Sequence, residues 1–475
     1  MKLHEKLILI FILILAFIPR FTQLGYSHFY GDETKALYTQ KGISAREYFM
    51  NQRKGPVQSL VSWAMEKVVG SYDEFYTRLP YALAGFLAVL GFFLVAKALT
   101  STPSSLLATF LFSLSGFYIA YSRTVQYQSL LLMFGLFSVW FFYLYTEKKN
   151  NLLLLISAGL LALSVLSHYD GLFFVIPIAY FFLTHREISI KHAVAFFLVP
   201  SVFITGLFYV PYLLGGYFGT NTFAYLYQRA LGFYLLPNSS FFTFRVYNPL
   251  YVSLIPAVFV FIPFVGKIKK QNIALFAWFI IPFVAFELLF SNPGTHIHNY
   301  MIPLYILSGL GIYRVFTLLK NKSLQTLYCV TIAIVFALIA VANYSIYIPK
   351  FNTGYPWVDS HVGPVSLARV ERGKYQIFLY GFPYNRGWAQ IREYIFTSVP
   401  DKPRNFSTND NVTIAEFYMS PLLAYHARPQ YYIEVFDNQL DKELKETIDD
   451  PLIYFMEKEF YVDGKLVAKL YRRLI

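Results

Sequence analysis

Long apolar runs separated by short polar breaks are the feature that most constrains how this chain can fold. We count about eleven runs of roughly 14–22 residues, close to the length that crosses the hydrocarbon core of a bilayer. They cover residues 6–22, 79–99, 106–122, 129–146, 152–167, 171–184, 193–214, 249–266, 273–290, 300–319 and 326–347. The sequence therefore predicts an all-α polytopic membrane protein, with about 11 transmembrane helices within residues 1–347.

The composition supports this class and excludes others. Charged residues make up only 14% of the 475 residues, against about 25% in a soluble domain. The net charge of +13 includes no basic cluster dense enough to predict a nucleic-acid partner. A single cysteine, Cys329, excludes a disulfide within the chain. Pro19 and Arg20 follow the apolar stretch Leu7–Ile18 in place of a small-residue cleavage site, so we expect this segment to remain as the first span.

The basic residues predict the orientation. Lys and Arg gather at the N-terminus and in most of the alternate breaks that lie on its side of the membrane. The short breaks on the other side, at residues 123–128, 168–170 and 291–299, hold only Arg123. By the positive-inside rule the N-terminus is cytoplasmic, and an odd number of spans places residues 348–475 outside. We therefore expect a multi-pass protein of the plasma membrane with an extracytoplasmic C-terminal domain.

This C-terminal region has mixed strand and helix patterns, which predict a small α/β domain. Strands are expected at residues 375–380, 430–436 and 451–455, and helices at 387–396, 420–426 and 441–448. The long first outer loop, residues 23–78, is expected to form amphipathic helices along the membrane plane.

That first outer loop carries the sharpest chemical features. Asp32 and Glu33 are adjacent carboxylates, suited to general-base catalysis or metal binding, although Asp32 could instead cap a helix over residues 34–40. Arg53 and Lys54 precede a Gly-Pro turn that could present them to a phosphate; they could equally rest on anionic lipid headgroups.

Other polar residues fall in the short outer breaks. Arg123 could bind an anion or extend to the headgroups, and Gln126 and Gln128 could recognise hydroxyls or form an ordinary connector. His168 and Tyr169 interrupt an apolar stretch, where polar groups need partners or a wet cavity.

His296 and His298, in the last of these breaks, could ligate a metal together with a carboxylate such as Glu33, or serve the structure alone. Because all these segments fall on one predicted side, they indicate an outer cavity for an anionic, lipid-linked substrate.

The order of these motifs resembles the GT-C superfamily of polyprenyl-phosphate-sugar transferases, within glycosyltransferase family 39. That group includes protein mannosyltransferases and is similar to the aminoarabinose transferase of lipid A. The marks are Asp32-Glu33, Lys54-Gly55-Pro56, Thr77-Arg78-Leu79-Pro80, Tyr121-Ser122-Arg123, His168-Tyr169, the segment from His298 through Tyr300 to Pro303, and Gly387-Trp388.

The resemblance implies that Asp32 is the catalytic base. The chain departs from the family at two places. Many relatives have an acid where this chain has Gln126 and Gln128, and many have Arg-Tyr where it has Asn299-Tyr300. Phosphate binding is therefore expected to fall to Arg123 and Lys54.

These observations predict an inverting membrane glycosyltransferase that moves a monosaccharide from a polyprenyl-phosphate carrier to a hydroxyl of a protein, lipid or glycan acceptor. No nucleotide-binding loop is found. No cofactor is expected, although a divalent metal stays open. Catalysis is assigned to Asp32 and Glu33, and donor binding to Arg53, Lys54, Arg123, Gln126, Gln128, His168, Tyr169, His298 and Tyr300.

Two alternatives belong to other classes. A transporter or flippase of lipid-linked saccharides would also have many spans and a basic cavity, but it should show internal repeats and charges within several spans. A non-catalytic scaffold for surface assembly would not need Asp32 and Glu33.

Overall fold

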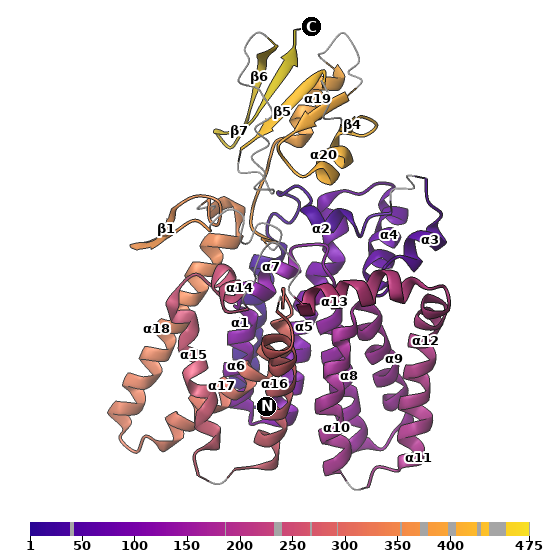
Figure 1. Cartoon of the computed structure of the whole chain (residues 1–475). Helices are drawn as coiled ribbons and strands as arrows, with labels where there is room; N and C mark the ends of the chain where they lie inside the picture. Colours follow the sequence, from indigo (N-terminus) through magenta and orange to yellow (C-terminus); the bar gives the residue numbers. More distant parts are fainter. Residues whose placement is uncertain are drawn as a thin grey trace.

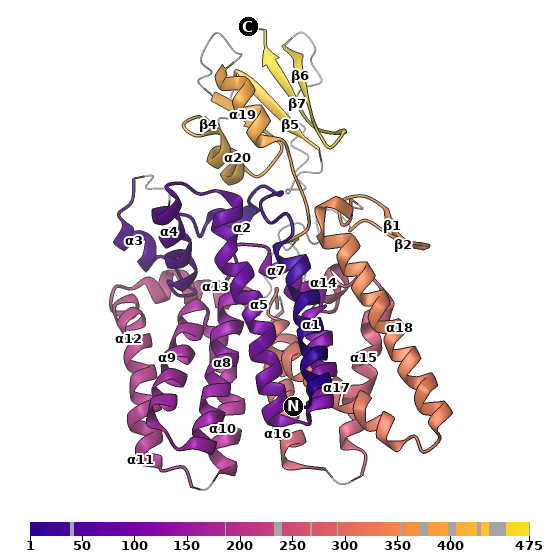
Figure 2. The same cartoon turned by 180° about the vertical axis from the view of Figure 1, so that it is seen from behind.

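The computed structural model shows a tall bundle of helices with a small sheet at one end (Figure 1). The structure describes residues 1–38, 42–185, 187–231, 240–266, 268–291, 293–351, 354–370, 379–397, 405–424, 429–436 and 453–474. Seen from behind, α1 runs through the middle of the bundle and α18 leans away at its edge (Figure 2).

The first half of the bundle contains α1 (Leu3–Phe21), α2 (Gly31–Thr34), α3 (Ala45–Met50), α4 (Val57–Val69), α5 (Glu74–Leu99), α6 (Thr102–Ser113), α7 (Gly116–Ser122), α8 (Tyr127–Lys148), α9 (Asn151–Ser167), η1 (Tyr169–Phe174), α10 (Val175–Thr184), α11 (Ile190–Ala193), η2 (Val194–Leu198) and α12 (Val199–Leu214). The second half contains η3 (Phe218–Phe223), α13 (Ala224–Leu231), α14 (Ser240–Tyr247), η4 (Tyr251–Leu254), α15 (Ile255–Val258), η5 (Phe259–Phe264), α16 (Lys270–Leu288), α17 (His298–Leu318), α18 (Lys322–Tyr347) and η6 (Pro349–Phe351).

The polytopic helical membrane fold is confirmed, but the length of the helices differs from expectation. All eleven predicted runs contain helix. Within the described residues, however, six helices are long and apolar enough to cross a membrane, or seven if the bent pair α6 and α7 is one span. The rest are α1, which carries Glu5, Lys6 and Arg20, and three shorter apolar stretches that end at Ser167, Thr184 and Phe264.

The bend of 60° between α6 and α7 has a local cause. α7 begins at Gly116, whose backbone N–H donates to the side chain of Asn248 at 2.9 Å. A Cβ at Gly116 would lie 1.9 Å from the carbonyl oxygen of Tyr247, so only glycine permits this approach. The bend thereby brings α7 against α14, at the end of the bundle that carries the sheet.

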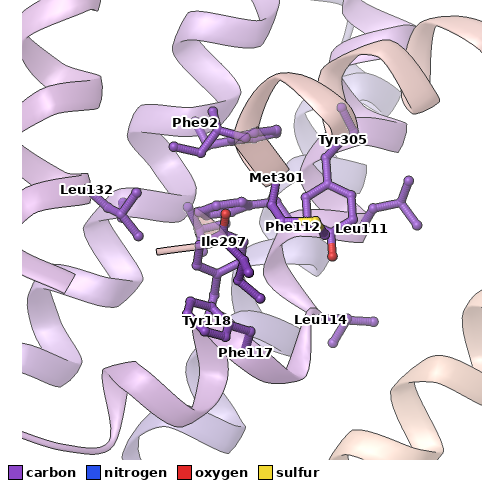
Figure 3. Packing of buried hydrophobic residues seen from close by; sticks show 14 of the residues in the cluster. Phe92, Leu111, Phe112, Leu114, Phe117, Tyr118, Leu132, Ile297, Met301 and Tyr305 are labelled. Atoms are coloured by element: carbon purple, nitrogen blue, oxygen red, sulfur yellow. The ribbon is translucent and has the colours of Figure 1, made fainter. Parts of the chain in front are cut away.

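The main core joins α5, α6, α7, α8 and α17. Phe92 of α5 stacks on Phe112 of α6 with ring centroids 4.3 Å apart, and Tyr118 of α7 lies against the same ring (Figure 3). Met301 and Tyr305 of α17 belong to the same group of buried side chains (Figure 3). The core therefore fixes the ends of α7, α8 and α17, from which the polar breaks begin.

After α18 come the hairpin β1 (Ser360–Val362) and β2 (Val365–Leu367) and a second sheet. This sheet has the order β4-β3-β5-β7-β6, with β3 parallel to β4 and β5 and the other pairs antiparallel. Its elements are α19 (Trp388–Thr397), β3 (Asn405–Thr408), α20 (Val412–Met419), β4 (Leu423–Ala424), β5 (Tyr431–Val435), β6 (Tyr454–Val462) and β7 (Lys465–Arg473).

The structure matches the expected helix at 387–396 and the strand at 430–436, and β6 begins within the expected strand at 451–455. The helix expected at 420–426 is wrong. α20 ends at Met419 instead, because Pro421 disfavours a helical conformation at Ser420 and has no N–H for the helix. The strand expected at 375–380 and the helix at 441–448 fall largely or wholly outside the described residues.

The close packing of α17 on α6 gives a stability prediction. A Cβ at Gly309 would lie 2.6 Å from the backbone of Ser104 and Ala108. We expect Gly309→Ala to destabilise the protein by about 1–3 kcal/mol through overpacking. Gly159→Ala is the control, because a Cβ there meets nothing within 4 Å. Thermal unfolding in detergent should show a lower midpoint for the first variant only; equal midpoints would contradict this packing.

Candidate active site

Asp32 lies in the short helix α2, at the end of the bundle that faces the sheet (Figure 1). One carboxylate oxygen pairs with the Lys35 ammonium at 2.5 Å, and the other accepts the Tyr380 hydroxyl at 2.8 Å. The side chain keeps 38% of its exposure. The alternative that Asp32 caps a helix is wrong, because Asp32 is inside α2 and Tyr30 occupies the N-cap position.

The charge state of Asp32 follows from these neighbours. Burial raises the pKa of Asp32. The positive charges of Lys35 and Lys54 lower it, and so do the hydrogen bonds from Lys35 and Tyr380. Together they lower the pKa to about 2. Asp32 is therefore a carboxylate at neutral pH, able to accept a proton.

Glu33 points away from Asp32 into the protein. Its two oxygens accept Arg78 Nε and Nη2, each at 2.9 Å, and both side chains are almost fully buried. The same oxygens accept the backbone N–H of Val125 at 2.8 Å and of Tyr30 at 2.6 Å. With all these acceptor positions used, the geometry favours a positioning role for Glu33 over the catalytic role expected from the sequence.

Asp32 opens onto a polar cavity of about 500 Å³. Its walls come from α2, from the segment between α3 and α4, from the start of α8, and from η3 and α13. The lining residues are Asp32, Lys35, Ala36, Asn51, Gln52, Arg53, Lys54, Gly55, Gln58, Gln126, Thr220, Asn221, Ala224, Tyr225 and Gln228.

Two cations predicted from the sequence reach this cavity. The Lys54 ammonium lies over the ring of Tyr127 at 4.5 Å, and the Arg53 guanidinium lies over the ring of Tyr225 at 3.6 Å. Burial and the neighbouring cations lower the pKa of Lys54 to about 8, although Asp32 raises it. Within the described residues no carboxylate is in ion-pair distance of Lys54, so its charge is available to an anion in the cavity.

The two glutamines behave differently. Gln126 lines the cavity, and its buried side-chain Nε2 has no hydrogen-bond partner. Gln128 lies deeper, where its Nε2 donates to the Thr295 hydroxyl at 3.5 Å. Gln126 is thus the one of the pair placed to meet a ligand in the cavity.

Arg123 requires a correction. Its Nη1 donates to the carbonyls of Pro19 at 2.6 Å and Thr22 at 3.0 Å, and its Nη2 donates to Gln23 at 3.4 Å. The side chain is 4% exposed and lines no part of the cavity. Arg123 therefore binds carbonyls at the C-terminal end of α1, and neither a phosphate contact nor an extension to the headgroups fits these contacts.

His168 and Tyr169 are not among the residues that line the cavity. His168 stacks on Tyr127 with ring centroids 4.1 Å apart. Its neighbour Asp170 is buried, and the carboxylate also pairs with His296 at 2.6 Å and with His298 at 3.3 Å. His168, Asp170 and His296 form a group that could hold a metal ion. Glu33, the carboxylate expected to complete such a site, belongs instead to Arg78.

Tyr300 requires a similar correction. Its hydroxyl donates to Glu287 at 2.8 Å, and both residues line a separate, mostly apolar cavity of about 310 Å³ between α14, α16 and α17. The structure therefore separates Tyr300, like His298, from the cavity at Asp32.

Several residues at the site were not assigned from the sequence. Lys35 follows Asp32 at helical spacing and could have been found by that spacing. Tyr380 could not, since 348 residues separate it from its partner Asp32. Tyr225 of α13 is also new; it lines the cavity, and the Arg229 guanidinium lies over its ring at 4.8 Å.

Comparisons with known proteins agree with this fold. The family model of dolichyl-phosphate-mannose-protein mannosyltransferase matches residues 53–212. The structure is similar to ArnT from Cupriavidus metallidurans bound to undecaprenyl phosphate, with a TM-score of 0.56, 13% identity, and coverage of 98% of this chain and 97% of that one. A search of curated proteins finds no match.

Two longer proteins are also similar. The arabinofuranosyltransferase AftD from Mycobacteria matches with a TM-score of 0.54 and 11% identity, over 99% of this chain and 42% of its own. The oligosaccharyltransferase AglB from Archaeoglobus fulgidus, in complex with an inhibitory peptide and a dolichol-phosphate, matches with a TM-score of 0.51 and 11% identity, over 91% of this chain and 69% of its own.

The buried pair of Glu33 and Arg78 gives a second prediction. Glu33→Gln leaves the Arg78 charge buried without its counterion, so we expect it to cost about 3–5 kcal/mol of stability. Glu66→Gln is the matched control, since Glu66 pairs with Lys67 at 3.1 Å near the surface and should cost less than about 1 kcal/mol. Thermal unfolding in detergent compares the two, and equal midpoints would refute the importance of the buried pair.

Proposed function

We propose that this chain is a member of the GT-C superfamily of membrane glycosyltransferases and transfers a monosaccharide from a polyprenyl-phosphate carrier to an acceptor hydroxyl. The reaction proceeds on the outer face of the membrane with inversion at the anomeric carbon. The observation that carries the proposal is a single ionised carboxylate, Asp32, at the edge of a polar cavity that also contains Lys35, Arg53 and Lys54.

The cations suit the phosphate of the donor. Lys54 and Arg53 project from the turn before α4, and their charges are held by aromatic rings rather than by carboxylates. A phosphate in the cavity would exchange these cation–π contacts for stronger charge-assisted hydrogen bonds. Arg53 can hold two phosphate oxygens in its planar fork, whereas Lys54 acts as a point charge.

Asp32 serves as the general base. The acceptor oxygen attacks the anomeric carbon, its proton passes to Asp32, and the bond from the anomeric carbon to the phosphate oxygen breaks. The lipid phosphate leaves with the bonding electrons and is stabilised by Lys54 and Arg53. Glu33 and Arg78 hold α2 in place, and Gln126 offers its unpartnered amide to a hydroxyl of the sugar.

The resting pKa of about 2 makes Asp32 a weak base. Donor binding would raise the pKa of Asp32 and make it a stronger base. A phosphate in the cavity competes for Lys35 and Lys54, the two cations that hold the pKa of Asp32 down, and adds a negative charge beside it. The base would therefore gain strength only when the donor is present, which limits wasteful reaction with water.

The proposed acceptor is a hydroxyl of a protein, a lipid or a glycan. The ArnT and AglB structures contain undecaprenyl phosphate and dolichol-phosphate, respectively, which supports a lipid-phosphate carrier here. An outer-face reaction fits the absence of a nucleotide-binding loop from the sequence. The sugar would enter from the bilayer while still attached to its lipid.

Replacement of the base tests this proposal most directly. Asp32→Asn keeps the shape but removes the proton acceptor, so turnover should fall by about 100-fold or more while donor binding persists. Glu47→Gln, an exposed acid of the same loop, is the control and should leave turnover unchanged. Mass spectrometry of the purified protein with a panel of polyprenyl-phosphate sugars measures transfer. Parent-like turnover in Asp32→Asn would reject Asp32 as the base.

The pH dependence of donor use gives a further prediction. Lys54 has a pKa of about 8, so it is charged below this pH and loses its charge as the pH rises through it. The KM for the donor should therefore rise from about pH 7 to about pH 9. In Lys54→Arg the charge persists, so the rise should move to higher pH. The same alkaline profile in both proteins would exclude Lys54 as its origin.

Labelling of cysteines tests the orientation. In a Cys329→Ser chain, we expect a membrane-impermeant maleimide to label Glu393→Cys, an exposed position of α19, in intact cells. Lys322→Cys, exposed at the start of α18, should react only after lysis. The opposite pattern would place the cavity on the cytoplasmic side and exclude an outer-face reaction.

A further inference from the structure

A buried carboxylate brings three histidines together. Asp170 Oδ1 lies 3.1 Å from His168 Nδ1, while its Oδ2 lies 2.6 Å from His296 Nδ1 and 3.3 Å from His298 Nε2. These side chains are at most 8% exposed. A ligand atom of His168, one of His296 and an oxygen of Asp170 all lie within 4.8 Å of one another.

The charge of Asp170 needs a cation. In the part of the chain that the structure describes, no Lys or Arg lies in ion-pair distance of this carboxylate. Its other partner is the neutral amide of Asn299, which donates to Oδ2 at 2.8 Å. A buried carboxylate without a counterion is costly, so either a proton on an imidazole or a metal ion must balance it.

Neither protonation state of His168 Nδ1 satisfies both of the groups that face it. If Nδ1 is unprotonated, it accepts the Asp170 backbone N–H at 3.1 Å but also faces Oδ1 of the same residue, another acceptor. If Nδ1 is protonated, that backbone N–H loses its acceptor. On the other side of the carboxylate, Nε2 of His298 faces Asp170 Oδ2 at 3.3 Å but has no partner that satisfies hydrogen-bond geometry. Buried polar atoms of this kind indicate a missing ligand.

We propose that His168, Asp170 and His296 bind a zinc ion and that His298, whose Nε2 lies 3.3 Å from Asp170 Oδ2, moves in as the fourth ligand when the ion is bound. Imidazole nitrogens with one carboxylate are a zinc donor set, whereas magnesium and calcium prefer sites made of oxygens. With bonds of about 2.0–2.1 Å, neighbouring ligand atoms of a tetrahedral site lie about 3.3 Å apart, close to the distances around Asp170. The Asn299 amide would orient the carboxylate from outside the metal's own ligands.

With His298 as the fourth ligand the site would have no open position, which marks it as structural rather than catalytic. It would join the break between α9 and η1 to the beginning of α17, two regions far apart in the sequence. His168 stacks on Tyr127, and Tyr127 carries the Lys54 ammonium on its ring. The ion would therefore fix the imidazole on which Tyr127 stacks, and through Tyr127 the position of the Lys54 ammonium.

Metal content tests the inference in the absence of any sugar donor, so its outcome is independent of the proposed transfer. The full chain is purified in detergent through a tag that contains no histidine, and its metals are measured by plasma mass spectrometry. We expect about one zinc ion per chain. His168→Ala and His296→Ala should lose it, whereas His361→Ala, an exposed histidine of β1, should retain it.

The unsubstituted chain provides a second measurement in case these variants do not fold. Removal of the ion with a chelator should lower the unfolding temperature, and zinc but not magnesium should restore it. Cobalt(II) bound in place of zinc should show the strong visible absorption of a tetrahedral site. A chain that neither contains nor takes up zinc would overturn the inference. Equal zinc in the parent, His168→Ala and His296→Ala would overturn it as well, since the ion would then bind elsewhere.

Discussion

The ion pair between Glu33 and Arg78 is the contact on which the arrangement of the cavity depends. Arg78, at the start of α5, donates to Glu33 and also to the carbonyls of Leu24, Ser27 and His28. Glu33 in turn accepts the backbone of Val125, just before α8. One buried pair thus fixes the first loop against two core helices. Because Asp32 is the neighbour of Glu33 in α2, the direction of the carboxylate that we propose as the base is set by a residue whose own oxygens are all paired.

Across the site, some charged side chains are fully paired and stabilise the structure, whereas others have no ionic partner and remain available to a ligand. Arg123 is consumed by carbonyls at the end of α1, whereas Lys54 and Arg53 rest on aromatic rings. Carbonyl contacts made in a buried place are costly to break. Contacts with ring faces are weaker, so these two cations remain available to the phosphate of the proposed donor. Whether a cation stabilises the structure or remains free for a ligand therefore depends on its partners rather than on its distance from the membrane.

The sequence predicted the fold well where the signal is local. Apolar runs such as 129–146 and 326–347 have the composition of membrane helices by themselves, and α8 and α18 follow them closely. It also pointed to Asp32 and Lys54, because both stand in polar segments next to such runs. The sequence did not predict the role of a residue whose contacts come from distant parts of the chain. Nothing in the sequence around Arg123 shows that the carbonyls of Pro19 and Thr22 lie within its reach, and nothing near Asp170 shows that His296 approaches from a segment more than a hundred residues away.

The contact between Tyr380 and Asp32 means that the site is completed late in the synthesis of the chain. Since 348 residues separate the two partners, a chain that grows at roughly 5–20 residues per second needs on the order of half a minute to pass from one to the other. Throughout that interval the nascent chain already has the carboxylate and Lys35 but not the phenol. A premature stop after α18 would leave a full set of apolar helices in the membrane, with the carboxylate permanently in this unfinished state.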